Sequence, residues 1–461
     1  MSLANEILAG HYDNVVHLLS LDVDVNETDE YGYTPLIEAA IASQTPLAEL
    51  LIKHGADVTD TDVTSNTALH WAAENNNVEL CKLLLENGAD ANAYTHYSQS
   101  VLVKPLLRQQ QTLKELLYHS GADLSFAQDY INAKLIGHRF ELSGRVDIVD
   151  HRGRFVELNF EGFILEFTLS LIQNSLTHFK HNFTARNLRH RFNEIQRIID
   201  ALTVSQELIK YQHYLVNIAE HKQRIETLLS QSLLILPVAY TGHAVTFIKM
   251  GNYLVKCDRG EMSQRDSSVV IYQLTNPALF NSKFIKFLLY ERQEKNFIET
   301  GFITHLRLKR ITELALPSQI TGNCSWANVE AVVPSVLYLS ALIDGDFNNI
   351  KQHQQQALTL YRQWQNWDKD WALHQCVESF YEASPARKAS KASILAAVLF
   401  QGCDFKVPKD VKRAEKILNI LKHKEYQYIV KTYITVYIDK KQTEQGRNLL
   451  ELIDLAGIKG L

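Results

Sequence analysis

Thr67-Ala68-Leu69-His70-Trp71-Ala72-Ala73 is the stretch that decides the fold of the N-terminal quarter of the chain, because it is one copy of a repeat. A variant of it, Thr34-Pro35-Leu36-Ile37-Glu38-Ala39-Ala40, stands 33 residues earlier. A second marker keeps the same step of 33 residues, as Gly55-Ala56-Asp57, Gly88-Ala89-Asp90 and Gly121-Ala122-Asp123. Self-similarity at a fixed period of this length is typical of stacked repeats.

Each part of the repeat has a physical role. Thr34 and Thr67 can cap a helix N-terminus through the side-chain oxygen, and the glycine of each triplet can end a helix in a left-handed turn. The period and the motif resemble the ankyrin-repeat family, whose mark is T-P-L-H-x-A. We therefore expect an α-solenoid of about four ankyrin repeats over residues 1–125. The end copies are imperfect, as expected of repeats that cap a stack.

An ankyrin stack usually presents a surface that binds another protein. The tips of the turns carry polar and aromatic candidates for that contact: Tyr94, His96, Tyr97, Asp62 and Asn66. The alternative is that these tips are simply solvated, since loops are polar in any case.

Composition excludes several classes of function. The chain has 461 residues, which is too long for one core, and a formal net charge of −5, which gives no basic footprint for nucleic acid. Its five cysteines have no C-x-x-C spacing, which argues against a zinc site or a disulfide scaffold and for a reducing compartment. The N-terminus resembles no signal peptide, and the longest apolar run, Ala331–Ile343, is too short to span a bilayer. We expect a monomer with no metal, no cofactor and no membrane contact.

The remainder of the chain changes its periodicity several times. Residues 138–168 alternate as in a short β-hairpin, residues 185–231 have helical spacing, residues 233–275 have strand patterns, and the chain is mostly helical from Ser325 onward. We predict an α+β domain over 126–345 with a helical insert around 185–231. A helical C-terminal module would follow over 346–461.

One predicted hairpin brings a histidine and an aspartate together. The pair Gly251-Asn252 is a two-residue hairpin turn, so residues whose numbers sum to 503 face each other. His243 and Asp258 then become diagonal neighbours on one face, roughly 7 Å apart at Cβ and within reach of a hydrogen bond. The other face carries Ala244, Thr246, Ile248, Val255 and Cys257 and is the better core face, so we predict that Cys257 is a buried hydrophobe.

A second cysteine lies in a chemically different setting. Pro317 and Gly322 mark a loop, and an apolar helical run follows, which puts Cys324 at or just before a helix N-terminus. The helix dipole there stabilises a thiolate. A histidine beside it would form a thiolate–imidazolium pair, and an aspartate would orient that histidine. We predict Cys324 as nucleophile, His243 as base and acid, and Asp258 as orienter.

The segment Gln319…Gly322-Asn323-Cys324-Ser325-Trp326 resembles the papain-like cysteine proteases, whose cysteine is followed by a small residue and tryptophan. The chain order His, Asp, Gln, Cys matches the permuted branch of that fold, over roughly residues 230–345. The resemblance implies that the Gln319 side chain donates to an oxyanion hole together with the Cys324 N–H. Two departures are that Asn323-Cys324-Ser325 replaces the Asp-Cys-Gly of that branch and that Gln319 lies nearer the cysteine. Asn323 is the alternative donor.

Ankyrin repeats followed by a permuted papain-like domain are similar to the ankyrin-repeat effectors of Legionella. The resemblance implies delivery by a type IV secretion system into the cytosol or nucleus of a host cell. The leading hypothesis is an effector that recruits a host protein and hydrolyses a peptide or isopeptide bond. The alternatives are a catalytically inactive interaction scaffold and an acyltransferase on the same fold.

Overall fold

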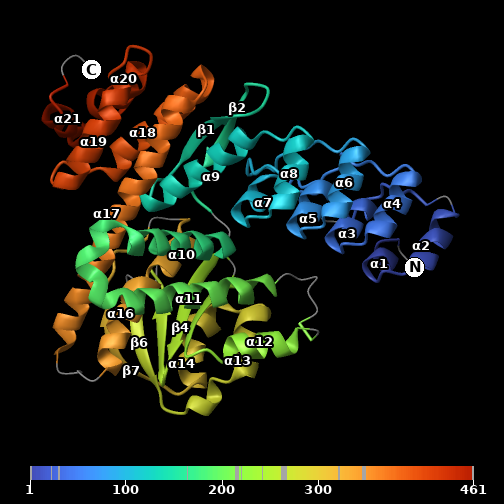
Figure 1. The fold of residues 1–461 in the computed structure, drawn as a ribbon, viewed down its shortest axis with the longest axis horizontal. Coiled ribbons are helices and arrows are strands. Elements are labelled where there is room, and N and C mark those ends of the chain that lie inside the picture. The colour runs from blue at the N-terminus through green and yellow to red at the C-terminus, as the bar shows by residue number, and fades with distance from the viewer. Residues whose placement is uncertain are drawn as a thin grey trace. The chain divides into compact units, whose positions relative to one another are not determined.

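The computed structural model describes residues 3–21, 23–29, 32–162, 165–212, 218–219, 221–240, 242–260, 267–319, 322–344 and 349–458. The chain packs into two compact units (Figure 1). The first comprises Met1–Lys134, Arg145–Asn159 and Phe380–Ile394, and the second Leu135–Gly144, Phe160–Ser379 and Leu395–Leu461. The domain boundaries predicted at 125/126 and 345/346 stay predictions.

Within the described residues, the first unit begins with a stack of four helix pairs. They are α1 (Leu3–Leu8) with α2 (Tyr12–Leu19), α3 (Pro35–Ile41) with α4 (Thr45–Lys53), α5 (Ala68–Glu74) with α6 (Val78–Glu86), and α7 (Val103–Leu107) with α8 (Gln111–His119). The spacing of these pairs follows the predicted repeat, which confirms the ankyrin solenoid.

The repeat residues perform the local roles that their chemistry predicts. Thr34 and Thr67 cap α3 and α5 by accepting a backbone N–H three residues on. Helix α7, in the fourth pair, has only five residues and no side-chain cap, as expected of a terminal copy. The three triplet glycines adopt left-handed φ angles of 91–95°, namely Gly55, Gly88 and Gly121.

Helix α9 (Leu124–Arg139) follows the stack, and the predicted hairpin comes next. Strands β1 (Arg145–Val149) and β2 (Phe155–Asn159) pair antiparallel. Helix α18 (Pro385–Gly402) contributes Arg387 to the first unit, where its guanidinium pairs with Asp123 and Asp129 at 2.6 and 2.8 Å.

The second unit is built on a five-stranded antiparallel sheet in chain order. Its strands are β3 (Leu233–Tyr240), β4 (His243–Met250), β5 (Tyr253–Cys257), β6 (Val269–Leu274) and β7 (Leu308–Leu314). Met250 pairs with Tyr253 and Thr246 with Cys257, which confirms the register predicted from the Gly251-Asn252 turn.

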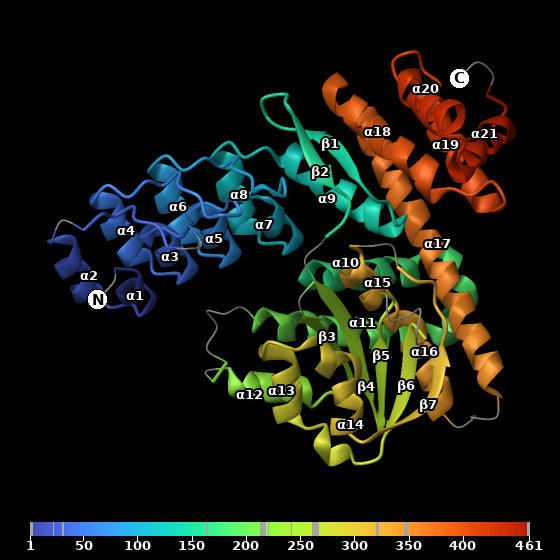
Figure 2. The ribbon, with the colours of Figure 1, turned by 180° about the vertical axis from the view of Figure 1, so that it is seen from behind.

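Helices cover both faces of this sheet, as the two opposite views show (Figures 1 and 2). One layer contains α10 (Leu165–His181), η1 (Phe183–Arg191), α11 (Phe192–Lys210), α15 (Cys324–Glu330), α16 (Val332–Ile343) and α17 (Ile350–Glu382). The other contains α12 (Lys222–Leu229), η3 (Pro277–Leu279), α13 (Ser282–Tyr290), η4 (Phe297–Gly301) and α14 (Phe302–His305).

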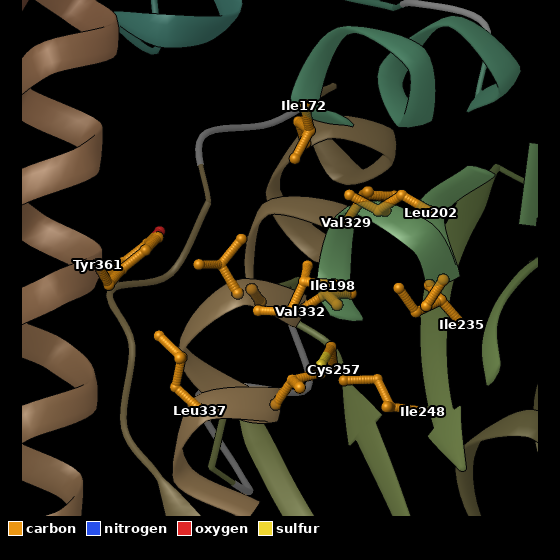
Figure 3. Packing of buried hydrophobic residues seen from close by; sticks show 14 of the residues in the cluster. Ile172, Ile198, Leu202, Ile235, Ile248, Cys257, Val329, Val332, Leu337 and Tyr361 are labelled. Carbon is orange, nitrogen blue, oxygen red and sulfur yellow. The ribbon is translucent and has the colours of Figure 1, made fainter. Parts of the chain in front are cut away.

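Alternate strand residues enter the two cores. Ile248 and Cys257 pack with Val329 and Val332 on the predicted core face, and Figure 3 shows them in one cluster. The prediction that Cys257 is buried is therefore confirmed. The opposite face, which sequence reasoning ranked as the poorer core, is buried as well through Val245, Phe247 and Leu254.

From Cys324 onward the described residues, 324–344 and 349–458, are mostly helical, as predicted. After α17 and α18 come α19 (Pro408–Leu421), α20 (Gln427–Ile434), η6 (Thr435–Lys440) and α21 (Glu444–Leu455). The helical run Cys324–Ile343 is longer than the predicted apolar run and, at 20 residues, could cross a membrane by length and composition alone. Because 89% of its apolar window is buried inside the protein, it has the character of a core helix.

Candidate active site

The predicted histidine–aspartate pair is present at the open end of the β4–β5 hairpin. His243 is the first residue of β4, and Asp258 directly follows β5. The His243 Nε2 lies 2.9 Å from Asp258 Oδ1, so the diagonal geometry that the turn predicted is correct. Lys256 Nζ lies 3.5 Å from the other carboxylate oxygen, and the Gly260 N–H donates to Oδ1 at 3.2 Å.

Cys324 is the first residue of α15, as the sequence predicted, and it is half-buried. The groups that lower the pKa of its thiol are the His243 side chain and the backbone N–H groups of Ala244 and Ser325. Because Asp258 occupies Nε2 of the imidazole, Nδ1 is the ring nitrogen left available to Cys324. Three residues from two distant segments thus form one hydrogen-bonded chain.

The electrostatics of this chain favour a charged pair. Burial alone would lower the pKa of His243, but the hydrogen bonds to Asp258 and Cys324 outweigh it and raise that pKa to about 9. Burial would raise the pKa of Cys324, but the bonds from His243 and the Ala244 N–H outweigh it and lower that pKa. These opposite shifts favour the thiolate–imidazolium pair over the neutral pair.

The other cysteines differ from Cys324 in their surroundings. Burial raises the pKa of the thiols of Cys81, Cys257 and Cys403 to about 12, and Cys376 is buried too. These four side chains are small hydrophobes in cores. Among the described residues, no cluster of His, Cys, Asp and Glu could hold a metal ion.

Tyr240 and Gly260 enclose the imidazole. The Tyr240 ring meets that of His243 edge to face, with centroids 5.4 Å apart. Burial, together with the nearby charge of Asp258, raises the pKa of Tyr240, so its hydroxyl stays neutral. A Cβ added to Gly260 would lie 2.5 Å from His243 Cε1, so only glycine fits against the ring in this position.

The two predicted oxyanion donors lie in the segment before Cys324. Gln319 follows β7, its backbone N–H donates to the Arg259 carbonyl at 2.8 Å, and its Oε1 is buried without a hydrogen-bond partner in the described structure. Asn323 is buried beside Cys324. Its Oδ1 lies 2.5 Å from His138 Nδ1, whereas its Nδ2 has no hydrogen-bond partner among the described residues.

Sequence reasoning missed two residues of this region. His138, near the end of α9, holds Asn323 and stacks on Trp326 with centroids 5.7 Å apart. Asn328, one turn after Cys324, bonds to both arms of the hairpin. The spacing Cys324–Asn328 puts both side chains on one helix face and could have indicated the second residue. The sequence holds no local indication of the first.

The predicted partner-binding residues of the ankyrin repeats fall into two groups. Asp62 is buried and accepts bonds from Thr64, Asn66 and the Trp71 indole, so Asp62 and Asn66 hold a turn together. Tyr94 packs against Phe126, with centroids 5.6 Å apart. His96 is exposed beside Ser65, and Tyr97 is 69% exposed. The turn that carries Tyr94, His96 and Tyr97 is therefore more accessible than the turn that carries Asp62 and Asn66.

Comparison with known proteins supports the ankyrin repeats and gives a relative of the whole chain. The ankyrin-repeat family profile matches three copies over residues 2–95, whereas no curated protein matches the chain. Among solved structures, that of the Legionella effector AnkH is 46% identical to this chain, with a TM-score of 0.89, and the match covers 100% of this chain and 98% of that one. Identity at this level over both full lengths shows common descent. The chain belongs to the family of the Legionella effector AnkH.

Proposed function

We propose that this protein is a bacterial effector that binds a host protein through its ankyrin repeats and hydrolyses a peptide or isopeptide bond at Cys324. The observation that carries the proposal is the hydrogen-bonded chain Asp258–His243–Cys324, with a raised pKa on the imidazole and a lowered pKa on the thiol. A cysteine helix packed on an antiparallel sheet that carries the histidine and the aspartate also supports a papain-like fold.

The first half of the reaction is acyl transfer to the enzyme. The Cys324 thiolate attacks the carbonyl carbon, and a sulfur–carbon bond forms as the carbonyl π electrons move to oxygen. When the intermediate collapses, the carbon–nitrogen bond breaks and the His243 imidazolium gives its proton to the leaving amine. The products are a thioester on Cys324 and a neutral imidazole.

The second half regenerates the enzyme. The neutral His243 takes a proton from water as the water oxygen attacks the thioester carbon. The carbon–sulfur bond then breaks, and the carboxylic acid leaves. Asp258 keeps the imidazole oriented and stabilises its charged form in both halves.

The negative oxygen of each intermediate needs hydrogen-bond donors. The Cys324 N–H is available because the first N–H groups of a helix have no intrahelical acceptor. The Gln319 amide is the second proposed donor, and the unpartnered Asn323 Nδ2 is the alternative. Loss of one such donor costs roughly 3 kcal/mol of transition-state stabilisation.

The biological setting follows from the family. We infer delivery by a type IV secretion system into the cytosol or nucleus of a host cell, where the ankyrin surface recruits a host protein. The triad requires neither a metal nor a cofactor for this chemistry.

Alkylation by iodoacetamide as a function of pH tests the proposal. Peptide mass spectrometry follows each of the five cysteines separately, so the other four serve as internal controls. We expect Cys324 to react selectively at neutral pH and to lose this reactivity in His243→Ala. Reaction of Cys324 no faster than that of the buried cysteines would instead indicate an interaction scaffold. Acetyl transfer from acetyl coenzyme A to host proteins would indicate an acyltransferase.

A further inference from the structure

Asn328 lies where the cysteine helix meets the hairpin. It is four residues after Cys324 in α15, on the same face of the helix, and is only 1% exposed. Its Nδ2 donates to the Ala244 carbonyl at 2.5 Å, and its Oδ1 accepts the Arg259 N–H at 2.7 Å. These two partners directly follow His243 and Asp258 in the chain. The orientation of the amide is fixed, because one partner accepts and the other donates.

The hairpin register shows what these partners would otherwise do. A β-turn at Gly251-Asn252 makes Met250 and Tyr253 a hydrogen-bonded pair. Bonded pairs alternate along an antiparallel ladder, so Thr246 and Cys257 are also such a pair. The next one would join Ala244 to Arg259, each donating its N–H to the other's carbonyl. The observed ladder stops at Thr246 and Cys257.

All four backbone groups of that missing pair have other partners. The Ala244 carbonyl and the Arg259 N–H bond to Asn328. The Arg259 carbonyl accepts the Gln319 N–H at 2.8 Å. The Ala244 N–H is the backbone donor that lowers the pKa of the Cys324 thiol. The two strands are thus held apart at this position, and each opened group binds a segment of the candidate site.

We infer that Asn328 is a positioning residue that keeps the hairpin open at Ala244 and Arg259, so that the Ala244 N–H points to the Cys324 sulfur. The inference rests on the proposed function, since it assigns a purpose to the opening. Asn328 touches no reacting atom. It acts by occupying the two groups that would otherwise join the strands.

Removal of this amide leaves the Ala244 carbonyl and the Arg259 N–H buried and unpaired. The lowest-cost repair is for them to bond to each other, which closes the ladder by one pair. Closure turns the Ala244 N–H toward the Arg259 carbonyl and away from the sulfur. The thiolate then loses one of its donors, and the pKa of Cys324 rises.

The test is the pH dependence of Cys324 alkylation in the full chain, with iodoacetamide as the probe. In Asn328→Ala we expect the midpoint to move up by about one pH unit, so that Cys324 reacts about tenfold more slowly below it. Ser335→Ala is the matched control. It removes another buried polar side chain, which bonds to Cys257 instead, and should leave the midpoint unchanged.

A second variant guards against misfolding. Asn328→Asp keeps the shape and the acceptor for Arg259 but cannot donate to Ala244 when ionised, so its midpoint should rise as well. Thermal melting shows whether both variants fold. If both fold and the pH midpoint of Cys324 alkylation equals that of the wild type, the inference is wrong.

A separate measurement distinguishes this failure from failure of the proposed function. Closure of the ladder replaces the weak sulfur acceptor of the Ala244 N–H by the Arg259 carbonyl. Amide hydrogen exchange at Ala244 should therefore slow in Asn328→Ala, whether or not Cys324 is catalytic. An unreactive Cys324 in the wild type would contradict the proposed peptidase function but would not affect the prediction for hydrogen exchange. Unchanged exchange at Ala244 would contradict the predicted closure of the ladder.

Discussion

Gly260→Ala is the sharpest test of the site geometry, because it adds one methyl group against the His243–Asp258 pair. The new Cβ would lie 2.5 Å from His243 Cε1, 2.9 Å from its Nε2 and 3.2 Å from Asp258 Oδ1. Carbon atoms in contact prefer about 3.5–4.0 Å, so the imidazole must move by about 1 Å. The φ of Gly260 is not left-handed, so the backbone tolerates alanine and the effect arises from this contact alone.

A displacement of about 1 Å at a reacting group can cost about 100-fold in rate. We therefore expect Gly260→Ala to slow the proposed hydrolysis about 100-fold. It should also raise the pH midpoint of Cys324 alkylation, because the thiolate loses its imidazolium partner. The assay pairs that alkylation profile with a thermal melt. Gly301→Ala is the control, since its Cβ would meet Phe297 at 3.1 Å, in another element of the same unit. Wild-type alkylation in a folded Gly260→Ala protein would refute the placement of His243.

Three further predictions concern charge and surface. Asp258→Asn should lower the pKa of His243 from about 9, so the imidazolium should lose its proton at a lower pH. Titration of the histidine signals by NMR measures this pKa, and an unchanged pKa of His243 would contradict the prediction. Burial raises the pKa of Glu38 from 4.5 to about 7. The contribution of Glu38 to the free energy of unfolding is therefore complete below pH 4.5 and is lost as the pH rises through about 7. Glu38→Gln should therefore stabilise the protein by about 1–3 kcal/mol at pH 7 and by little at pH 4.5, as measured by denaturant unfolding at both values. Tyr97→Ala should reduce capture of the host partner from lysate, in quantitative mass spectrometry against wild type, without lowering the melting temperature, because the ring is 69% exposed; a lowered melting temperature would point to a structural role.

Local features of the sequence were sufficient for the hairpin. The Gly251-Asn252 turn sets the register, and the register places His243 beside Asp258 without knowledge of any distant contact. The ankyrin repeats were predictable for the same reason, since each repeat contacts only its neighbours. The convergence of Cys324 on His243 is different, because no local pattern specifies a contact across 81 residues; only the family resemblance indicated it.

The residues that were missed all act over long sequence separations. His138 reaches Asn323 across 185 residues, and Asn328 reaches Ala244 across 84. Each is a common residue with no motif of its own, so its role exists only after the chain has folded. The second buried face of the sheet was missed because the helices that cover it, α12 to α14, follow no pattern that links them to a particular strand face.

The contrast between two cysteines bears on whether the site is catalytic. Cys257 and Cys324 are both at least partly withdrawn from water, yet burial raises the pKa of the first to about 12, whereas hydrogen-bond donors lower that of the second. Holding a thiolate and an imidazolium in such a place requires an aspartate, two backbone N–H groups and a glycine against the ring. Apolar side chains of similar volume would fill the same space at equal or lower cost. Binding alone does not require this arrangement, and this is the ground on which we propose an enzyme rather than a scaffold.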